Sequence, residues 1–433
     1  MKKPILISLS PNAQKDDVIL ALKLIFQPWK WKNNRKSTIV ENPLSLLEEK
    51  FKEYLPIKHG FTFNSGRSAF FGILKSLDIE QGEVLLQAFT CSAAVNPIVK
   101  AGFKPVFVDI DKNTLNIDTT DLEAKISNRS RIVLVQHTFG QPADLEQILT
   151  LCQKYSLILI EDCAHSLGAS YYNQKLGLPT DSASAKVGTF AKAAFFSFGR
   201  DKVISSVFGG MAVTDDDELA KKLEEYQASL NYPTRLWTCQ QLLHPILNKF
   251  FVIPFYGFFG IGKWILILLQ KLNFLSKAVK DKEKQGLMPD NLIKRMPDKL
   301  ALLALNQFNK LENILNHQKE IANFYQENLK NLNFILPNSD PQRIYMRYSV
   351  LLKSQDPDKI LKRARRQNIF LDDGWRKTAI VPPDSNQEKL GYQINSCPHA
   401  EIVAKKILNL PTHINISKED AGKIVDLLKK DGN

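Results

Sequence analysis

The stretch FFSFGRDKVISSVFGGMAVT, residues 195–214, decides the fold that we expect for this chain. A hydrophobic run ends near Ser197, a lysine follows at Lys202, and a Gly-Gly pair that permits tight turning leads into a second run at 210–214. This pattern indicates two strands joined by a polar loop. Because ligands of open α/β sheets lie beyond the carboxyl ends of the strands, residues 197–202 form a candidate site.

The region from about Gly60 to Thr214 alternates short β-branched or aromatic runs with helical patterns, as a doubly wound parallel sheet requires. Two helices are expected at 92–102 and 144–155, where apolar residues recur at intervals of three and four. The expected strands are 83–87, 105–110, 131–136, 156–162, 193–198 and 210–214. A chain of 433 residues exceeds what one core usually serves, so a second domain is expected.

The composition, 44% hydrophobic and 24% charged residues, is that of an ordinary globular protein. A net charge of +13 favours an anionic partner, namely a phosphorylated ligand, an acidic membrane surface or nucleic acid. The sequence contains no recognised nucleic-acid-binding motif, so we expect no nucleic acid partner. The five cysteines are scattered and the histidines lack metal-ligand spacing, which predicts a cytoplasmic protein without a metal site.

Lys202 becomes a candidate catalytic residue when it is considered together with Asp162, which ends the expected strand in LILIEDCAHSLGA. Taken alone, Lys202 would be a solvated surface charge and Asp162 would be a helix cap. A desolvated lysine, however, can attack an aldehyde to form an imine. A buried carboxylate can pair with a protonated pyridine nitrogen and keep that ring an electron sink. The pair therefore indicates an enzyme that carries pyridoxal 5'-phosphate.

The segment SGRSAFFGIL, residues 65–74, places Gly66 directly before an expected helix. Free backbone N–H groups and the helix dipole favour a phosphate at such a position, and the Ser197 hydroxyl would add a further contact. The alternative is an ordinary helix cap without a ligand.

These segments, in this order, resemble the DegT/DnrJ/EryC1/StrS family of sugar aminotransferases, which have the aspartate aminotransferase fold, or fold type I. The resemblance extends over nearly the whole chain, through ISLSPN, TCSAAVNPI, FVDID, HTFGQPADLEQI, RMPDKLALLALNQF and CPHAEIVAKKILNLPTH. It implies an α/β large domain with a mostly parallel seven-stranded sheet between helices, and a smaller C-terminal α+β domain. The expected units are an N-terminal arm with helices (1–60), the cofactor-binding large domain (61–230), an apolar and basic helical insertion (231–294) and the small domain (295–433).

The resemblance also implies roles for single residues. Lys202 would carry the cofactor as a Schiff base, Asp162 would hold the pyridine nitrogen, and His165 would contact the ring or its phenolic oxygen. The remaining cofactor contacts would be Ser65, Gly66, Arg67, Ser197 and Cys91.

The activity implied by the resemblance is amination of the keto carbon of a nucleotide-linked sugar, with glutamate as donor, by a homodimer with shared active sites. The alternatives are a cofactor-dependent sugar dehydratase and a non-catalytic, cofactor-binding regulatory protein. Lys202 argues against the dehydratase, because the relatives that remove a hydroxyl carry histidine there.

The sequence departs from the family pattern at three places. Cys91 stands where an aromatic residue usually stacks on the ring, and Phe89 is the candidate substitute. The sequence at 293–296 is Ile-Lys-Arg-Met where Asn-Tyr-Arg-Met is usual, so Lys294 or Arg295 would have to replace the cross-subunit phosphate contact. An acidic residue usually precedes the Gly-Gly pair, and this chain has Phe208.

Residues 243–300 break the α/β pattern with a nearly continuous apolar tract at 250–269, and carry ten Lys/Arg against four Asp/Glu. Prolines and glycines interrupt the tract, which favours a helical hairpin over a membrane span. We interpret the aromatic run 250–259 as packing in the core or on a dimer partner. The alternative is peripheral membrane contact through 243–290, since basic residues beside apolar surface suit a bilayer interface.

Overall fold

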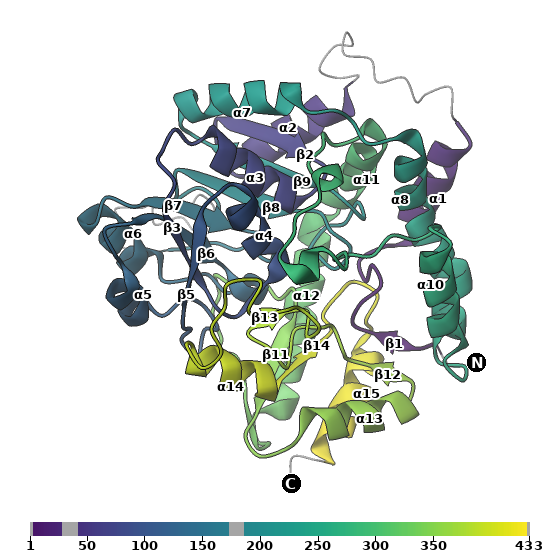
Figure 1. Cartoon of the computed structure of the whole chain (residues 1–433). Helices are drawn as coiled ribbons and strands as arrows, with labels where there is room; N and C mark the ends of the chain where they lie inside the picture. Colours follow the sequence, from purple (N-terminus) through teal and green to yellow (C-terminus); the bar gives the residue numbers. More distant parts are fainter. Residues whose placement is uncertain (1–2, 28–41, 173–185, 431–433) are drawn as a thin grey trace.

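The computed structural model describes residues 3–27, 42–172 and 186–430, and a seven-stranded sheet lies at its centre (Figure 1). The strand order is β2-β9-β8-β7-β6-β3-β5, and all neighbours are parallel except for β9, which is antiparallel to both β2 and β8. The strands are β2 (His59–Phe63), β3 (Glu83–Gln87), β5 (Lys104–Val108), β6 (Ser130–Gln136), β7 (Ile158–Asp162), β8 (Ala193–Ser197) and β9 (Gly210–Thr214). This confirms the mostly parallel sheet, and all six expected strands are present.

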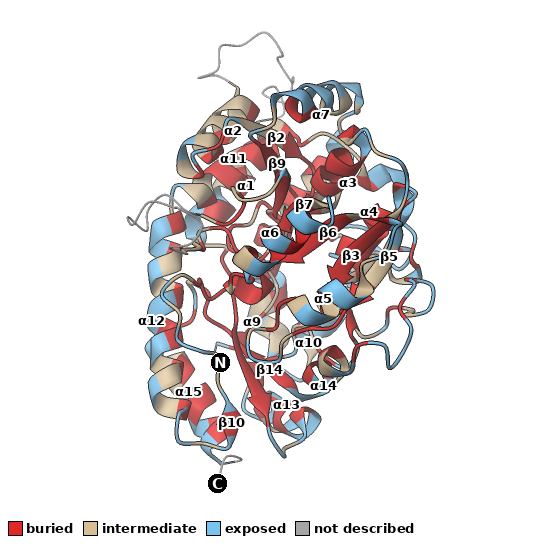
Figure 2. Ribbon diagram, turned by 90° about the vertical axis from the view of Figure 1, so that its left-hand side faces the viewer, coloured by how far each residue is buried: buried red, intermediate tan, exposed pale blue. Residues whose placement is uncertain are grey.

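Helices cover both faces of the sheet because alternate side chains of each central strand point to opposite faces. Leu85 and Val133 belong to a core beneath α5 (Thr119–Lys125) and α6 (Leu145–Lys154), whereas Leu86 belongs to a larger core on the other face. The helices that contribute buried residues, red in Figure 2, to the larger core include α1 (Lys15–Ile25), α2 (Pro43–Tyr54), α3 (Gly66–Ser76), α4 (Ser92–Lys100), α7 (Asp217–Ser229) and α11 (Asp298–Phe308). The two helices expected at 92–102 and 144–155 are thus α4 and α6.

A smaller α+β unit follows, built on the antiparallel strands β10 (Phe334–Ile335), β11 (Tyr348–Leu352) and β14 (Ile407–Leu410). The long helix α12 (Leu311–Leu329) contributes buried residues to both units. The other helices of this unit are α13 (Pro357–Arg366), α14 (Pro398–Lys406) and α15 (Lys418–Lys429). The small C-terminal α+β domain is therefore confirmed, and Ser417 with Asp420 forms a capping box at the start of α15.

Two short parallel pairings tie distant parts of the chain to this unit. Near the N-terminus, β1 (Ile5–Leu6) pairs with β12 (Ile369–Phe370). Beside the large domain, β4 (Thr90–Cys91) pairs with β13 (Ile380–Val381). The second pairing brings a small-domain segment to the edge of the candidate site.

The apolar tract forms the expected hairpin: α8 (Arg235–Leu247) runs through a π-helical turn (Asn248–Val252) into α9 (Ile253–Tyr256), and α10 (Ile261–Lys271) returns beside it. The interpretation of the run 250–259 as core is wrong for four of its phenylalanines, which are exposed. Their exposed fractions are 54% for Phe250, 52% for Phe251, 43% for Phe258 and 90% for Phe259. In the part of the chain that the structure describes, no helix is long and apolar enough to cross a membrane.

Candidate active site

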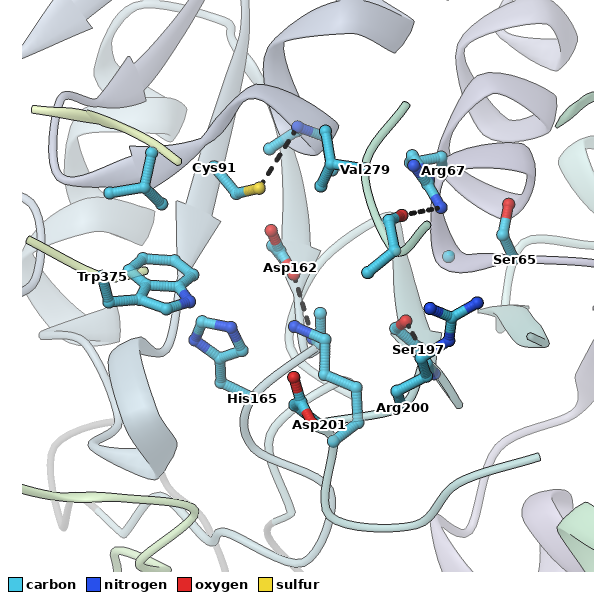
Figure 3. A pocket seen from close by; sticks show the side chains of 18 of the residues that line it. Ser65, Arg67, Cys91, Asp162, His165, Ser197, Arg200, Asp201, Val279 and Trp375 are labelled. Atoms are coloured by element: carbon cyan, nitrogen blue, oxygen red, sulfur yellow. Dashed lines mark hydrogen bonds between the residues drawn. The ribbon is translucent and has the colours of Figure 1, made fainter. Parts of the chain in front are cut away.

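A pocket opens at the carboxyl ends of β7 and β8, between the large domain and the small one (Figure 3). All eight residues expected at the cofactor site line it, although they come from segments that are far apart in sequence. They are Ser65, Gly66, Arg67, Cys91, Asp162, His165, Ser197 and Lys202.

Asp162 ends β7 and lies almost entirely out of contact with solvent, where its Oδ1 accepts a hydrogen bond from the Ala164 N–H at 2.9 Å. Burial raises the pKa of this carboxyl, while the Ala164 N–H and the charge on Lys202 oppose that rise. Burial in turn lowers the pKa of Lys202, and the charge on Asp162 is the largest opposing influence. The pocket thus holds a lysine biased toward its neutral, nucleophilic form beside a buried acid.

His165 and Trp375 form an aromatic side of the pocket. Burial first, and then the charges on Lys202 and Arg347, hold the pKa of His165 well below its usual range. Its Nδ1 accepts from the Phe139 N–H at 3.5 Å, so the neutral ring carries its proton on Nε2. The Trp375 ring stands edge-on to His165, with centroids 4.8 Å apart.

Phe89 does not line the pocket; it is buried behind it and packs edge-on against Trp375 at 5.7 Å. Its expected role as a substitute for the missing ring-stacking aromatic is therefore not supported. Trp375, contributed by the small domain, is an aromatic side chain that lines the pocket together with Cys91 (Figure 3).

The start of α3 meets the loop after β8 at the opposite end of the pocket. The Ser65 hydroxyl caps α3 by accepting from the Ser68 N–H at 3.2 Å. A Cβ on Gly66 would lie 2.9 Å from the Ser197 Cβ, and one on Gly210 would lie 2.4 Å from the Gly66 nitrogen. Only glycines allow this approach, which brings the first N–H groups of α3 and the Ser197 hydroxyl together as anion donors.

Two arginines add positive charge at this end. Arg67 pairs with the fully buried Glu283 and donates to the Ala278 carbonyl at 3.2 Å. Arg200, 8% exposed, donates to the Ser276 hydroxyl, and its Nε has no hydrogen-bond partner in the structure. Burial, with Arg67 nearby, lowers the pKa of Arg200 to about 10. Glu283 pairs with Arg67, and the charge on Asp201 acts on Arg200. Two arginines so close together still suit an anion such as a phosphate.

The insertion itself closes this end, because Ala278 and Val279 line the pocket and Ser276 and Glu283 hold the two arginines. Lys294 and Arg295, expected to replace the family's phosphate contact, do not line the pocket of their own chain. The Lys294 carbonyl accepts from the Asn64 N–H, and the Arg295 guanidinium lies over the Tyr232 ring.

The small domain contributes a third cation. Arg347, 4% exposed, lines the pocket with its Nε 3.4 Å from Asp373 Oδ2. Asp373 also accepts from the Trp375 N–H at 3.1 Å and from the Asn409 amide at 2.9 Å. Arg347 is thereby held where a carboxylate of a small ligand can be bound.

The segment ISLSPN packs against the lysine loop. The Asn12 side-chain amide donates to the Lys202 and Val203 carbonyls, each at 3.0 Å, and its oxygen accepts from the Ile414 N–H at 3.2 Å. Asn12 therefore fixes the backbone that carries Lys202.

Outside the pocket, the described residues include one buried trio, His137, Glu161 and Cys163, close enough to hold a metal ion. Its atoms already have other partners. His137 accepts from the Ala143 N–H at 3.1 Å and donates to Glu161 at 3.0 Å. Glu161 also accepts from the backbone N–H groups of residues 188, 190 and 191. The trio thus joins β7 to the segment before β8.

Lys202, partly buried and with a lowered pKa, lies in one pocket with the buried carboxylate of Asp162 and an anion cradle at a helix start, an arrangement that fits an enzyme dependent on pyridoxal phosphate. The profile of the DegT/DnrJ/EryC1/StrS aminotransferase family matches residues 32–232 and 271–429, and the chain belongs to that family.

Similar proteins share most of the length of the chain. GDP-perosamine synthase of Escherichia coli O157:H7 is 26% identical over 381 residues, 87% of either chain. Spore coat polysaccharide biosynthesis protein SpsC of Bacillus subtilis is 26% identical over 389 residues, 88% of this chain and 87% of that one. Among solved structures, PseC of Helicobacter pylori, an aminotransferase of pseudoaminic acid biosynthesis, superposes with a TM-score of 0.72 over 99% of both chains at 23% identity, which shows the shared fold.

The sequence does not predict the roles of Arg200, Arg347 and Trp375, which line the pocket, or of Asn12, which supports the lysine loop. Arg200 lies within the decisive stretch, two residues before Lys202, and an arginine at a strand end could have been identified as an anion ligand. The other three gave no local signal.

Proposed function

We propose that the chain transfers an amino group from glutamate to the keto carbon of a nucleotide-linked sugar, in glycan or polysaccharide biosynthesis. The observation that carries the proposal is that Lys202, whose pKa is lowered, and the buried Asp162 line one pocket of a chain of this family. Relatives named for amino-sugar synthesis support the substrate class.

The pocket residues fit the cofactor by the chemistry of their donors. Lys202 would bind it covalently, Asp162 would pair with the ring nitrogen, and the His165 Nε2–H would donate to a ring oxygen. The phosphate would be held by Ser65, Ser197, the first N–H groups of α3, and the charges of Arg67 and Arg200. When bound, pyridoxal phosphate supplies an electron-withdrawing ring that acidifies the Cα–H of an amino acid.

Lys202 Nζ transfers the proton in both halves of the reaction. With glutamate bound, it takes the proton from Cα; with the keto sugar bound, it returns a proton to the carbon that receives nitrogen. Its lowered pKa favours the neutral amine that this role needs. Asp162 must stay ionised throughout. Burial raises its pKa, the Ala164 N–H opposes that rise, and a protonated ring nitrogen beside the carboxylate would oppose it further.

Arg347 would orient the amino donor by binding one of its carboxylates. Asp373 holds the guanidinium in place, and Trp375 excludes water from the same side.

The assembly and location of the enzyme are further parts of the proposal. We propose a cytoplasmic homodimer whose subunits complete each other's sites, as the resemblance implies. The partner subunit need not close the phosphate end of the pocket, because the 276–283 segment of the same chain covers that end.

The test is the near-ultraviolet and visible absorption of the purified protein before and after adding glutamate. The wild type should show a cofactor band that glutamate bleaches, with 2-oxoglutarate released. Lys202→Ala should lack that band, and Lys192→Ala, which removes an exposed lysine paired with Asp216, should behave as wild type. A wild type without a band after addition of pyridoxal phosphate would refute the proposal.

The dehydratase alternative predicts a different product from a keto sugar. Amination consumes one glutamate for each amino sugar formed, whereas dehydration consumes none. Product analysis by mass spectrometry with labelled glutamate separates the two reactions.

A further inference from the structure

The hairpin at residues 248–274 concentrates exposed apolar side chains. Of the 18 large hydrophobic residues that are exposed in the described chain, nine fall within residues 250–274. They are Phe250, Phe251, Phe258, Phe259, Ile261, Trp264, Leu268, Leu272 and Phe274. Contiguous exposed apolar surface of this kind marks an interaction site in a soluble protein.

The same segment is free of acidic residues. Between Glu225 and Asp281 the sequence contains no Asp or Glu. It contains six basic residues: Arg235, Lys249, Lys263, Lys271, Lys277 and Lys280. A segment that exposes apolar side chains and carries only basic charges fits a bilayer, which has an apolar interior and, where its lipids are acidic, an anionic surface.

The hairpin packs closely against the rest of the protein, while its exposed apolar side chains face solvent. Gly262, the one buried residue of the described helix α10, lets that helix cross the preceding turn so closely that a Cβ would lie 2.3 Å from the Val252 carbonyl oxygen. On the other side, the Tyr256 ring packs edge-on against Phe370 of β12 at 4.9 Å. The exposed side chains therefore sit on a fixed helical platform.

The tip of the hairpin is the turn between α9 and α10. Phe258 and Phe259 occupy this turn, and Trp264 and Leu268 follow on α10, 70% and 55% exposed. Lys263 and Lys271 lie exposed on the same helix. Aromatic rings and lysine stems of this spacing suit the boundary between headgroups and acyl chains.

The hairpin is also an addition to the family pattern, because residues 233–270 fall between the two stretches that the family profile matches. We propose that this hairpin docks the enzyme on a bilayer of anionic phospholipids, with Phe258, Phe259, Trp264 and Leu268 entering the headgroup region and Lys249, Lys263 and Lys271 meeting lipid phosphates. The docking is peripheral and independent of the amination reaction.

A second copy of the chain fits this surface less well. In a two-fold contact the same patch meets itself, so the lysines of one acid-free hairpin would face those of the other. Like charges without intervening acids oppose such a contact, whereas lipid phosphates neutralise them.

The test is flotation of the full-length holoenzyme with vesicles of phosphatidylcholine alone and of phosphatidylcholine with phosphatidylglycerol. The wild type should float with the anionic vesicles, and less so as salt rises. The variant Phe259→Ser/Trp264→Ser/Leu268→Ser should bind them roughly tenfold more weakly or worse, with its cofactor absorption unchanged. A matched control is Ile335→Ser/Ile394→Ser/Ile402→Ser, at 45%, 65% and 51% exposure outside the hairpin, which should float as wild type.

A charge variant tests the second half of the proposal. Lys249→Gln/Lys263→Gln/Lys271→Gln should lose roughly tenfold in binding to anionic vesicles and little in binding to neutral ones. Failure of the wild type to float with either vesicle would overturn the proposal, as would equal flotation of the serine hairpin variant. If sedimentation shows that this variant alone changes from dimer to monomer while vesicles bind neither protein, the surface belongs to a second copy and the proposal is wrong.

Discussion

The pocket has a floor and a wall, and they are built differently. The floor comes from loops after neighbouring strands and from the start of α3, and it carries Lys202, Asp162 and Ser197. The wall comes from the small domain and the insertion, and it carries Arg347, Trp375 and the 276–283 segment. The floor supplies the groups for covalent binding and proton transfer, whereas the wall supplies groups that admit and orient ligands. The residues of the wall are far apart in sequence and come together only when the chain folds.

The largest expected effect falls on the floor. Asp162→Asn should slow the glutamate half-reaction about 10³-fold, because it removes the charge that would stabilise the protonated ring. Removing that carboxylate also takes away the influence that raises the pKa of Lys202, so the apoprotein should capture pyridoxal phosphate at lower pH than the wild type. Single-turnover absorption across pH measures both effects. Asp290→Asn, at an exposed carboxylate, is the control, and near-normal turnover in Asp162→Asn would contradict the assigned role.

The second-largest effect is expected at the ion pair between Arg67 and Glu283, which joins the floor to the wall. Glu283→Gln leaves Arg67 without its buried acid, so the free energy of unfolding of the apoprotein should fall by about 3 kcal/mol. A bound phosphate supplies negative charge in its place, so the loss should be smaller with pyridoxal phosphate present. Urea midpoints with and without cofactor measure the difference. Glu123→Gln, which removes an exposed partner of Lys154, should leave the midpoint unchanged, and an equal loss with and without cofactor would contradict the phosphate assignment.

A change confined to the wall should affect binding more than chemistry. Arg347→Gln should raise the KM for glutamate roughly 30-fold, the size expected for a charge-assisted hydrogen bond, with little change in the KM for the keto sugar. Steady-state kinetics with each substrate varied separately measures this. Arg343→Gln removes a buried arginine that stacks on Tyr345 outside the pocket, and it should leave both constants unchanged. If the two KM values rise together in Arg347→Gln, donor orientation is the wrong role.

The smallest expected effect tests the N-terminal support of the floor. Asn12→Ala removes two hydrogen bonds to the lysine loop and should lower kcat roughly tenfold while the KM for glutamate stays the same. Asn12→Asp, which keeps the size but loses the donor, should fall as far. Asn415→Ala, whose side chain binds the same segment at Pro11 and Ala13, is the control. An equal loss of kcat in Asn12→Ala and Asn415→Ala would show that Asn12 has only a structural role.

The floor could be predicted from the sequence because each part is a contiguous signal. The sequence predicts strands 83–87 and 210–214 to the residue, since each is a short, largely apolar run that is buried along its whole length. Strand β2 was missed as a separate strand because HGFTF lies at the sheet edge, is only half-buried over its first three residues, and begins with His and Gly.

The wall could not be predicted in the same way. Arg347 and Trp375 reach the pocket only because β13 pairs with β4 and because Asp373 holds the arginine, and neither contact leaves a pattern in local sequence. The hairpin shows the converse error. Hydrophobicity predicts that its apolar run packs in the core or on a dimer partner; the core part of this prediction is wrong, because short helices joined by close glycine packing leave the side chains on their outer faces exposed.

The pairing of β1 with β12 has a consequence for how the protein is made. Ile5 leaves the ribosome 364 residues before its partner Ile369, a delay of roughly 20 to 70 s at ordinary rates of translation. During that interval the central sheet can already form from residues 59–214, whereas the first strand must wait for its place in the smaller domain. The pairing of β1 with β12 therefore joins two segments that are far apart in sequence, and such long-range strand pairings form slowly.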